Sequence, residues 1–227
     1  MSLARSSRTI CIVTRGRGAP GSEERTRLLG RLAAAAHAGA DMIQIRERQF
    51  DDRSLLRFAE DVIEAVRPAG ARVLVNDRLD IALASGADGV HLKSDGPPVR
   101  DVRRIVPDRF AIGRSVHTDD EARAVESAGG CDYLFFGTVF RSASKPDDHV
   151  LAGIDGLRRI CAIVSLPVVA IGGVSIGRVP EMVAAGAAGI AAISLFSEAG
   201  DIAAVTAAVR DALTPAQGGV TLERGHD

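Results

Sequence analysis

The sequence contains no tryptophan, and tyrosine occurs only once among its 227 residues. Proteins that bind single-stranded nucleic acid stack the bases on exposed aromatic side chains, so this scarcity argues against that function. An excess of positive charge is missing too, because 28 basic residues face 29 acidic ones. Such a balance produces no global field that attracts a nucleic acid or an anionic membrane. We therefore expect no nucleic acid and no membrane among the partners.

Paired cysteine spacings and long apolar runs are absent as well. Cys11, Cys131 and Cys161 each lie in an apolar run, which is typical of small buried side chains in a reducing compartment. The first residues lack the apolar stretch and cleavage site of a signal peptide. No apolar run reaches membrane-spanning length. These absences predict a cytoplasmic protein.

Eight short apolar segments alternate with longer amphipathic ones. They are apolar almost throughout, as expected for parallel strands covered on both faces. The predicted strands are residues 10–14, 42–46, 72–76, 89–92, 110–115, 132–137, 167–171 and 189–194. The segments between them repeat apolar residues at intervals of three and four, which predicts helices.

This strict alternation predicts an α/β fold with a parallel sheet, and eight units in this length predict a closed (β/α)8 TIM barrel. No linker or low-complexity segment divides the chain. We expect one domain over residues 1–213, followed by a polar, disordered tail over residues 214–227.

Polar residues follow the predicted strands, at the edge where a (β/α)8 barrel carries its active site. After the seventh and eighth strands, Gly172-Gly173 and Ile193-Ser194 open helices. Exposed backbone N–H groups at such positions bind anions, and these two loops are the usual phosphate site of a barrel. The sequence therefore predicts one bound phosphate group there.

Cations and hydroxyls gather on the other predicted loops, which suggests a second and more highly charged group such as a diphosphate. The cations are Arg46, Arg48 and Lys145, and the hydroxyls are Ser115, Ser142 and Ser144. Asp77 lies beside Asn76 among these cations. Because Mg²⁺ often binds through one or two carboxylates together with substrate phosphates, Asp77 is a candidate Mg²⁺ ligand.

In this order, seven segments resemble the thiamine phosphate synthase and TenI superfamily. They are QIRER (44–48), NDRLDIAL (76–83), ADGVHL (87–92), IGRSVHT (112–118), DYLFFGTVFRSASK (132–145), VVAIGGV (168–174) and AGAAGIAAIS (185–194). The resemblance covers nearly the whole chain and implies a (β/α)8 barrel that handles a thiazole phosphate.

For a synthase, the resemblance implies that hydroxymethylpyrimidine diphosphate and thiazole phosphate combine to thiamine phosphate and pyrophosphate, with Mg²⁺ as cofactor. Gly173, Ile193 and Ser194 would bind the thiazole phosphate. The pyrimidine diphosphate would lie against Arg46, Asn76, Ser115 and Lys145, with Arg46 and Lys145 as the catalytic cations. Gln44, Arg48, Ser142 and Ser144 would complete the substrate site, and Asp77 would bind Mg²⁺.

The sequence departs from the synthase pattern in four places. Arg48 replaces a lysine, Lys93-Ser94 replaces Gly-Gln, and Ser142 and Ser144 replace threonines. The fourth departure concerns the metal, because the second Mg²⁺ aspartate is expected at position 96, which is Gly96. Asp95, one residue earlier, is the nearest substitute.

The TenI branch gives an alternative, since some of its members tautomerise the thiazole phosphate. His117 would then be the acid–base residue, because its unperturbed pKa lies near neutrality. A third hypothesis is a non-catalytic regulatory barrel that keeps the phosphate site. The synthase is the leading prediction, because Arg46, Asn76, Asp77, Ser115 and Lys145 are all present. The sequence leaves open a homo-oligomer and the role of Lys93.

Overall fold

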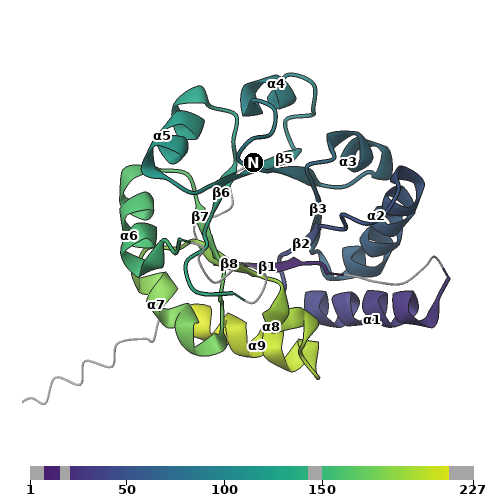
Figure 1. The fold of residues 1–227 in the computed structure, drawn as a ribbon. Coiled ribbons are helices and arrows are strands. Elements are labelled where there is room, and N and C mark those ends of the chain that lie inside the picture. Colours follow the sequence, from purple (N-terminus) through teal and green to yellow (C-terminus); the bar gives the residue numbers. More distant parts are fainter. Residues whose placement is uncertain (1–7, 16–20, 143–149, 215–227) are drawn as a thin grey trace, which may run out of the picture.

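The eight strands close into a parallel barrel in sequence order, and the last strand pairs with the first (Figure 1). This computed structural model describes residues 8–15, 21–142 and 150–214. The strands are β1 (Thr9–Val13), β2 (Met42–Ile45), β3 (Arg72–Asn76), β4 (Gly89–Leu92), β5 (Ala111–Val116), β6 (Tyr133–Phe136), β7 (Val168–Ile171) and β8 (Gly189–Ala192). The predicted TIM barrel is confirmed.

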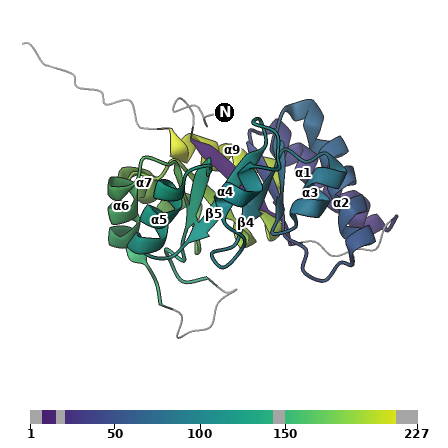
Figure 2. The same cartoon turned by 90° about the horizontal axis from the view of Figure 1, so that it is seen from above.

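Helices surround the barrel on all sides, with α1, α2 and α3 on one flank and α5, α6 and α7 on the opposite flank (Figure 2). The α-helices are α1 (Glu23–His37), α2 (Asp52–Val66), α3 (Leu79–Ser85), α4 (Val99–Arg103), α5 (Asp119–Ala128), α6 (Gly153–Ile163), α7 (Val179–Ala184), α8 (Ser194–Ser197) and α9 (Ile202–Leu213). Two short 3₁₀ helices are η1 (Arg67–Ala69) and η2 (Ile176–Arg178). Within the described ranges, no helix is long and apolar enough to cross a membrane.

Strand boundaries differ from the prediction by one or two residues at several ends. β8 ends at Ala192 rather than at residue 194, because Ile193 takes helical dihedral angles and Ser194 begins α8. β7 begins after Pro167, a residue without an N–H to donate to a sheet. Thr214 is the only described residue of the predicted tail, so the domain boundary at residue 213 stays a prediction.

Side-chain caps begin four of the helices. The side chains of Ser22, Asp51, Thr118 and Asp201 accept hydrogen bonds from backbone N–H groups in the first turns of α1, α2, α5 and α9. Each cap satisfies one of the N–H groups that a helix start leaves unpaired. These short polar residues therefore determine where the four helices begin.

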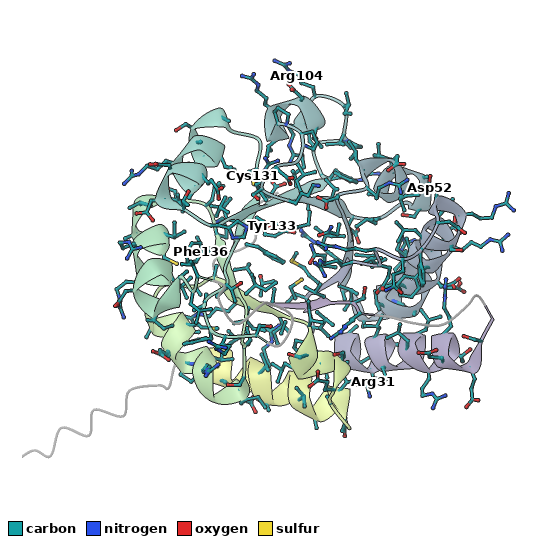
Figure 3. The ribbon with its side chains drawn as sticks, in the orientation of Figure 1. Arg31, Asp52, Arg104, Cys131, Tyr133 and Phe136 are labelled. Atoms are coloured by element: carbon teal, nitrogen blue, oxygen red, sulfur yellow. The ribbon has the colours of Figure 1, made fainter. Side chains whose placement is uncertain are left out.

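The core has two layers. Inside the barrel, a cluster is formed by Cys11, Val13, Met42, Leu74, Tyr133, Phe135, Val169 and Ala191. A larger layer lies between the barrel and the helices and contains Phe136, for example (Figure 3). Cys11 and Cys131 are buried as predicted, whereas Cys161 is half-buried, and all three are free thiols. Burial raises the pKa of the Cys131 thiol to about 12, so this side chain is neutral and unreactive.

The amino-terminal face of the barrel repeats one local structure. A glycine with positive φ precedes each even-numbered strand by a few residues, namely Gly39, Gly86, Gly130 and Gly186. Two residues after each of the first three of these glycines, an aspartate presents its carboxylate to the preceding strand. Asp41 accepts from Ile10 N–H at 2.7 Å, Asp88 from Val73 N–H at 2.8 Å, and Asp132 from Ile112 N–H at 2.7 Å.

Arginines reinforce two of these three carboxylates. Arg210 of α9 pairs with Asp41, and Arg103 of α4 pairs with Asp132 at 2.5 Å. In the fourth repeat the corresponding position is Ala188, whose own N–H donates to Val168 O at 2.7 Å. The repeated hydrogen bond therefore joins the strand pairs β1–β2, β3–β4 and β5–β6 at the face opposite the predicted site.

We expect Asp88→Ala to destabilise the fold. The substitution removes the acceptor of the Val73 N–H, and an unsatisfied buried donor costs about 1–3 kcal/mol. Urea unfolding followed by circular dichroism should show a loss of that size. The control is Asp101→Ala. The ion pairs that the Asp101 side chain forms with Arg100 and Arg104 are exposed, so this substitution should change stability by about 0.5 kcal/mol or less. Equal losses in both variants would contradict this role of Asp88.

Candidate functional site

Predicted site residues from β2, β3 and β4 form one hydrogen-bonded chain at the carboxyl ends of the strands. Gln44 Nε2 donates to Asn76 Oδ1 at 3.2 Å, and Asn76 Nδ2 donates to Asp77 Oδ2 at 2.9 Å. Asp77 Oδ1 accepts from the Lys93 N–H at 2.8 Å. The structure thus brings Gln44, Asn76 and Asp77 together, and it fixes both oxygens of the Asp77 carboxylate.

Asp77 also has an unusual backbone. Among the described residues it is the only non-glycine residue with positive φ, at 60°. Such a conformation costs of order 1 kcal/mol or more and occurs mainly where the surrounding structure enforces it, often at functional sites. Here the Asp77 N–H donates to His91 O at 2.9 Å, so the conformation directs the carboxylate toward the end of β4.

Arg46 and Arg48 place two cations next to this carboxylate. Burial lowers the pKa of Arg46, and the nearby positive charge of Arg48 lowers it further, while Asp77 and Glu47 oppose the shift. The Arg46 backbone N–H donates to Thr14 Oγ1 at 3.1 Å, and Thr14 Oγ1 donates to Glu47 Oε1 at 2.5 Å. Two like charges held close together, one of them half-buried, favour the binding of an anion.

The carboxylates of Asp95 and Asp77 contact different groups. The Asp95 carboxylate is 3.5 Å from Lys93 Nζ, and both of these side chains are largely exposed. Arg114 holds the backbone of this loop, because its guanidinium donates to the carbonyls of Ser94 and Pro97 at 2.7 Å and of Gly96 at 3.2 Å. Within residues 8–15, 21–142 and 150–214, no group of three or more His, Cys, Asp or Glu side chains could hold a metal.

The end of β5 contributes Ser115 and His117. His117 Nδ1 lies 2.6 Å from Gly137 O, and a carbonyl can only accept, so Nδ1 carries the proton. The His117 N–H donates to Glu121 Oε2 at 2.6 Å. The exposed ring is therefore oriented by the loop after β6, and its Nε2 is the nitrogen with a lone pair when the imidazole is neutral.

Ser115 belongs to a buried network that sequence reasoning missed. His91 Nε2 is 2.9 Å from Ser115 Oγ, and His91 Nδ1 is 3.0 Å from the Tyr133 hydroxyl. Burial lowers the pKa of His91 to about 3, with a smaller contribution from the charge of Arg114. The imidazole is therefore neutral at physiological pH. The signal available in the sequence was a histidine inside an otherwise apolar strand.

The loops after β6 and β7 pack on each other through glycine. Gly172 and Gly173 have φ of 102° and 62°. A Cβ at Gly173 would lie 2.4 Å from Arg141 O, and one at Gly172 would lie 2.4 Å from Thr138 Cγ2. Arg178 strengthens the contact, because it donates to Gly173 O at 2.8 Å and stacks on Phe140 with its Cζ 4.4 Å from the ring centroid.

Ile193 and Ser194 follow β8, where Ser194 opens the short helix α8. The first N–H groups of a helix have no partner inside it. Together with the glycine loop of Gly173, these residues occupy neighbouring strand ends, because β7 and β8 pair. Ser142 is the last described residue before residue 143, and the predicted ligands Ser144 and Lys145 lie outside the described residues.

Comparison with known proteins agrees with this arrangement. A family described as thiamine monophosphate synthase (TMP-TENI) matches residues 11–196. The chain is 45% identical over 190 residues to a thiamine-phosphate synthase of Methanoculleus marisnigri, covering 83% of this chain and 88% of the relative. It is 46% identical over 181 residues to a thiamine-phosphate synthase of Methanocella arvoryzae, covering 79% and 84%.

Solved structures give the same result. A thiamine phosphate pyrophosphorylase from Pyrococcus furiosus superposes with a TM-score of 0.79 at 32% identity, covering 92% of this chain and 96% of that one. A 3-hexulose-6-phosphate synthase superposes with a TM-score of 0.68, and its 18% identity shows a shared fold only.

We expect Gly173→Ala to disturb the site as well as the fold. The new Cβ would meet Arg141 O and would require an unfavourable φ, so stability should fall by about 1–3 kcal/mol. Inorganic phosphate, followed by isothermal calorimetry, should bind more weakly to the variant. Gly177→Ala in the following 3₁₀ helix η2 is the matched control, because a Cβ there meets nothing within 4 Å. Weaker phosphate binding in both variants would contradict this role of Gly173.

Proposed function

The chain belongs to the thiamine monophosphate synthase family, and on that premise we propose that its barrel is a thiamine-phosphate synthase. This transferase joins hydroxymethylpyrimidine diphosphate to thiazole phosphate and releases pyrophosphate. Relatives at 45% and 46% identity carry that name. The observation that supports the proposal is that two groups of residues suited to binding anions lie at one barrel mouth, one around Arg46 and Asp77 and the other at Gly173 and Ser194.

In this proposal the diphosphate lies over the ends of β2, β3 and β5. Arg46 and Arg48 supply charge, and a planar guanidinium matches two phosphate oxygens at once. Asn76 and Gln44 are already fixed by a hydrogen bond to each other. Ser115 supplies a hydroxyl from β5, and Ser142, Ser144 and Lys145 would close the site from the loop after β6.

The thiazole phosphate lies across the mouth, at the ends of β7 and β8. Gly173 has positive φ, and Arg178 donates to its carbonyl. In this proposal, the backbone N–H groups of the same loop would bind the phosphate. Ile193 and Ser194 add N–H groups from the start of α8. This site would fix the thiazole so that its ring nitrogen faces the pyrimidine.

The donor set fits Mg²⁺ held largely by the substrate. The Asp77 oxygens each accept one hydrogen bond and keep further lone pairs. Mg²⁺ commonly binds one or two carboxylates together with substrate phosphates and water. Asp77 would therefore be its main protein ligand, with Asp95 as a second ligand only if its contact with Lys93 is given up. When bound, Mg²⁺ would neutralise charge on the diphosphate.

The chemical step then requires electrostatics rather than acid–base catalysis. The bond between the pyrimidine methylene carbon and the diphosphate oxygen breaks, and its electron pair leaves with pyrophosphate. Arg46 and Lys145 stabilise that developing charge, while the thiazole nitrogen forms the new bond to the methylene carbon. Because donors fixed before the reaction need no reorganisation, the network of Gln44, Asn76 and Asp77 favours this step. We further propose that the protein is cytoplasmic. Whether it forms a homo-oligomer stays open.

The direct test is synthesis by the purified protein. With both substrates and Mg²⁺, we expect thiamine phosphate and pyrophosphate in equal amounts, detected by chromatography and a coupled pyrophosphate assay. Aromatisation of the thiazole phosphate tautomer without either product, lost in His117→Ala, would replace the synthase by the TenI-type reaction. Binding of thiazole phosphate with neither activity would support a regulatory barrel.

Asp77→Asn should separate folding from function. Asparagine tolerates positive φ but keeps only one of the two acceptor oxygens, so one hydrogen bond is lost and the stability should fall by about 1–2 kcal/mol. The loss of negative charge removes the metal ligand, and we expect kcat/KM to fall on the order of 10²-fold, with a higher Mg²⁺ requirement. The neighbouring variant Asp95→Asn is the matched control. A larger loss in Asp95→Asn than in Asp77→Asn would show that the metal depends mainly on Asp95.

Gly96→Asp should strengthen metal binding. Gly96 does not have positive φ, and a Cβ there would lie 3.1 Å from Lys93 O, so a small shift of the loop accommodates a side chain. The added carboxylate would supply a second charged ligand. The half-saturating Mg²⁺ concentration should therefore fall several-fold. An unchanged Mg²⁺ dependence would indicate that Asp95 already fills this role.

A further inference from the structure

Three side chains from three strands connect the barrel interior to the mouth. Tyr133 comes from β6, His91 from β4 and Ser115 from β5, the strand between them. The Tyr133 hydroxyl is 3.0 Å from His91 Nδ1, and His91 Nε2 is 2.9 Å from Ser115 Oγ. Tyr133 and His91 are both almost fully buried, with 1% of each exposed, whereas Ser115 is half-buried. The chain of hydrogen bonds thus begins in the core and ends at a predicted substrate ligand.

The burial of Tyr133 determines the direction of these hydrogen bonds. Among the described residues, His91 Nδ1 is the only partner of the tyrosine hydroxyl. A buried O–H that does not donate is costly, so Tyr133 donates and Nδ1 accepts. A neutral imidazole carries one proton, which therefore resides on Nε2 and is donated to Ser115 Oγ. Ser115 accepts this bond, which leaves its own O–H free to donate elsewhere.

Packing holds the network in one geometry. Tyr133 crosses β5 at Gly113, where a Cβ would lie 2.1 Å from the tyrosine Cζ. Only a glycine at this position lets the ring reach from β6 to β4. On the other side, the Phe135 ring lies against the imidazole with centroids 4.1 Å apart. The labelled Tyr133 lies on the barrel wall in Figure 3.

We propose that Tyr133 and His91 are positioning residues that fix the rotation of the Ser115 hydroxyl, so that its proton is directed to an oxygen of the bound diphosphate. The identity of that acceptor rests on the proposed function. Neither residue touches the reacting atoms in this proposal; both act through Ser115. A hydroxyl that is already oriented in the free protein loses less conformational entropy when the anion binds.

The first test is spectroscopic and needs no substrate. Nitrogen-15 NMR of histidine-labelled protein at neutral pH should show His91 with Nε2 protonated and Nδ1 unprotonated, because the two nitrogens differ strongly in chemical shift. In Tyr133→Phe, the Nδ1 shift should move, because its hydrogen-bond donor is lost while the ring remains. A proton on Nδ1 in the unmodified protein would overturn the proposal.

The second test is a double-mutant cycle on pyrophosphate binding in the presence of Mg²⁺, measured by calorimetry. We expect Tyr133→Phe to weaken binding about 3- to 10-fold, as the loss of one oriented hydrogen bond implies. In the Ser115→Ala background the same substitution should have almost no effect, because the hydroxyl that it orients is absent. Binding of the thiazole phosphate should be unchanged by Tyr133→Phe.

Thr206→Val provides the matched control. It also removes a buried hydroxyl, which donates to Ile202 O at 2.7 Å inside α9, and it should leave pyrophosphate binding unchanged. An equal effect of Tyr133→Phe with and without Ser115 would overturn the positioning role, because it would indicate a general structural defect. If the cycle holds but no thiamine phosphate forms, the proposed function fails and the positioning of Ser115 toward an anion stands.

Discussion

The structure depends on a carboxylate that accepts the backbone N–H of a neighbouring strand at the amino-terminal face of the barrel. Asp41, Asp88 and Asp132 each form this bond. A closed barrel tolerates no slip between strands, because a shift of one residue would exchange inward and outward side chains. These contacts lie at the amino-terminal face of the barrel. Side chains at the opposite face, where the strands end, can therefore be selected for binding and chemistry.

The layer of side chains just below the mouth contributes both to the rigidity of the barrel and to the candidate site. Its inward side chains are polar, unlike the apolar cluster beneath them, and they bond across strands from Gln44 to Asn76 and from His91 to Ser115. Buried polar groups without partners would be costly, whereas a fully bonded set is rigid. The site therefore gains fixed donors, and a bound anion would add negative charge beside Arg46 and Arg48, whose positive charges oppose one another.

Sequence reasoning identified the parts that depend on local pattern. All eight strands were found because near-continuous apolar segments and helical periodicity are local signals. The link between Tyr133 and His91 was missed, because it joins residues 42 positions apart and requires knowing which strands are neighbours. The positive φ of Asp77 also has no local signal, because tertiary contacts with β4 impose it.

The loop after β4 shows how backbone anchoring limits what a displaced ligand can do. The contact between Lys93 and Asp95 is exposed and is worth about 1 kcal/mol or less, so the Asp95 side chain can leave it at little cost. The backbone is different, because Arg114 holds the carbonyls of Ser94, Gly96 and Pro97 together. Moving Asp95 into the position of residue 96 would break several of these charge-assisted bonds, each stronger than the surface pair. Asp77 is consequently the carboxylate on which the proposed metal binding would depend, and a side chain at position 95 would act from the rim.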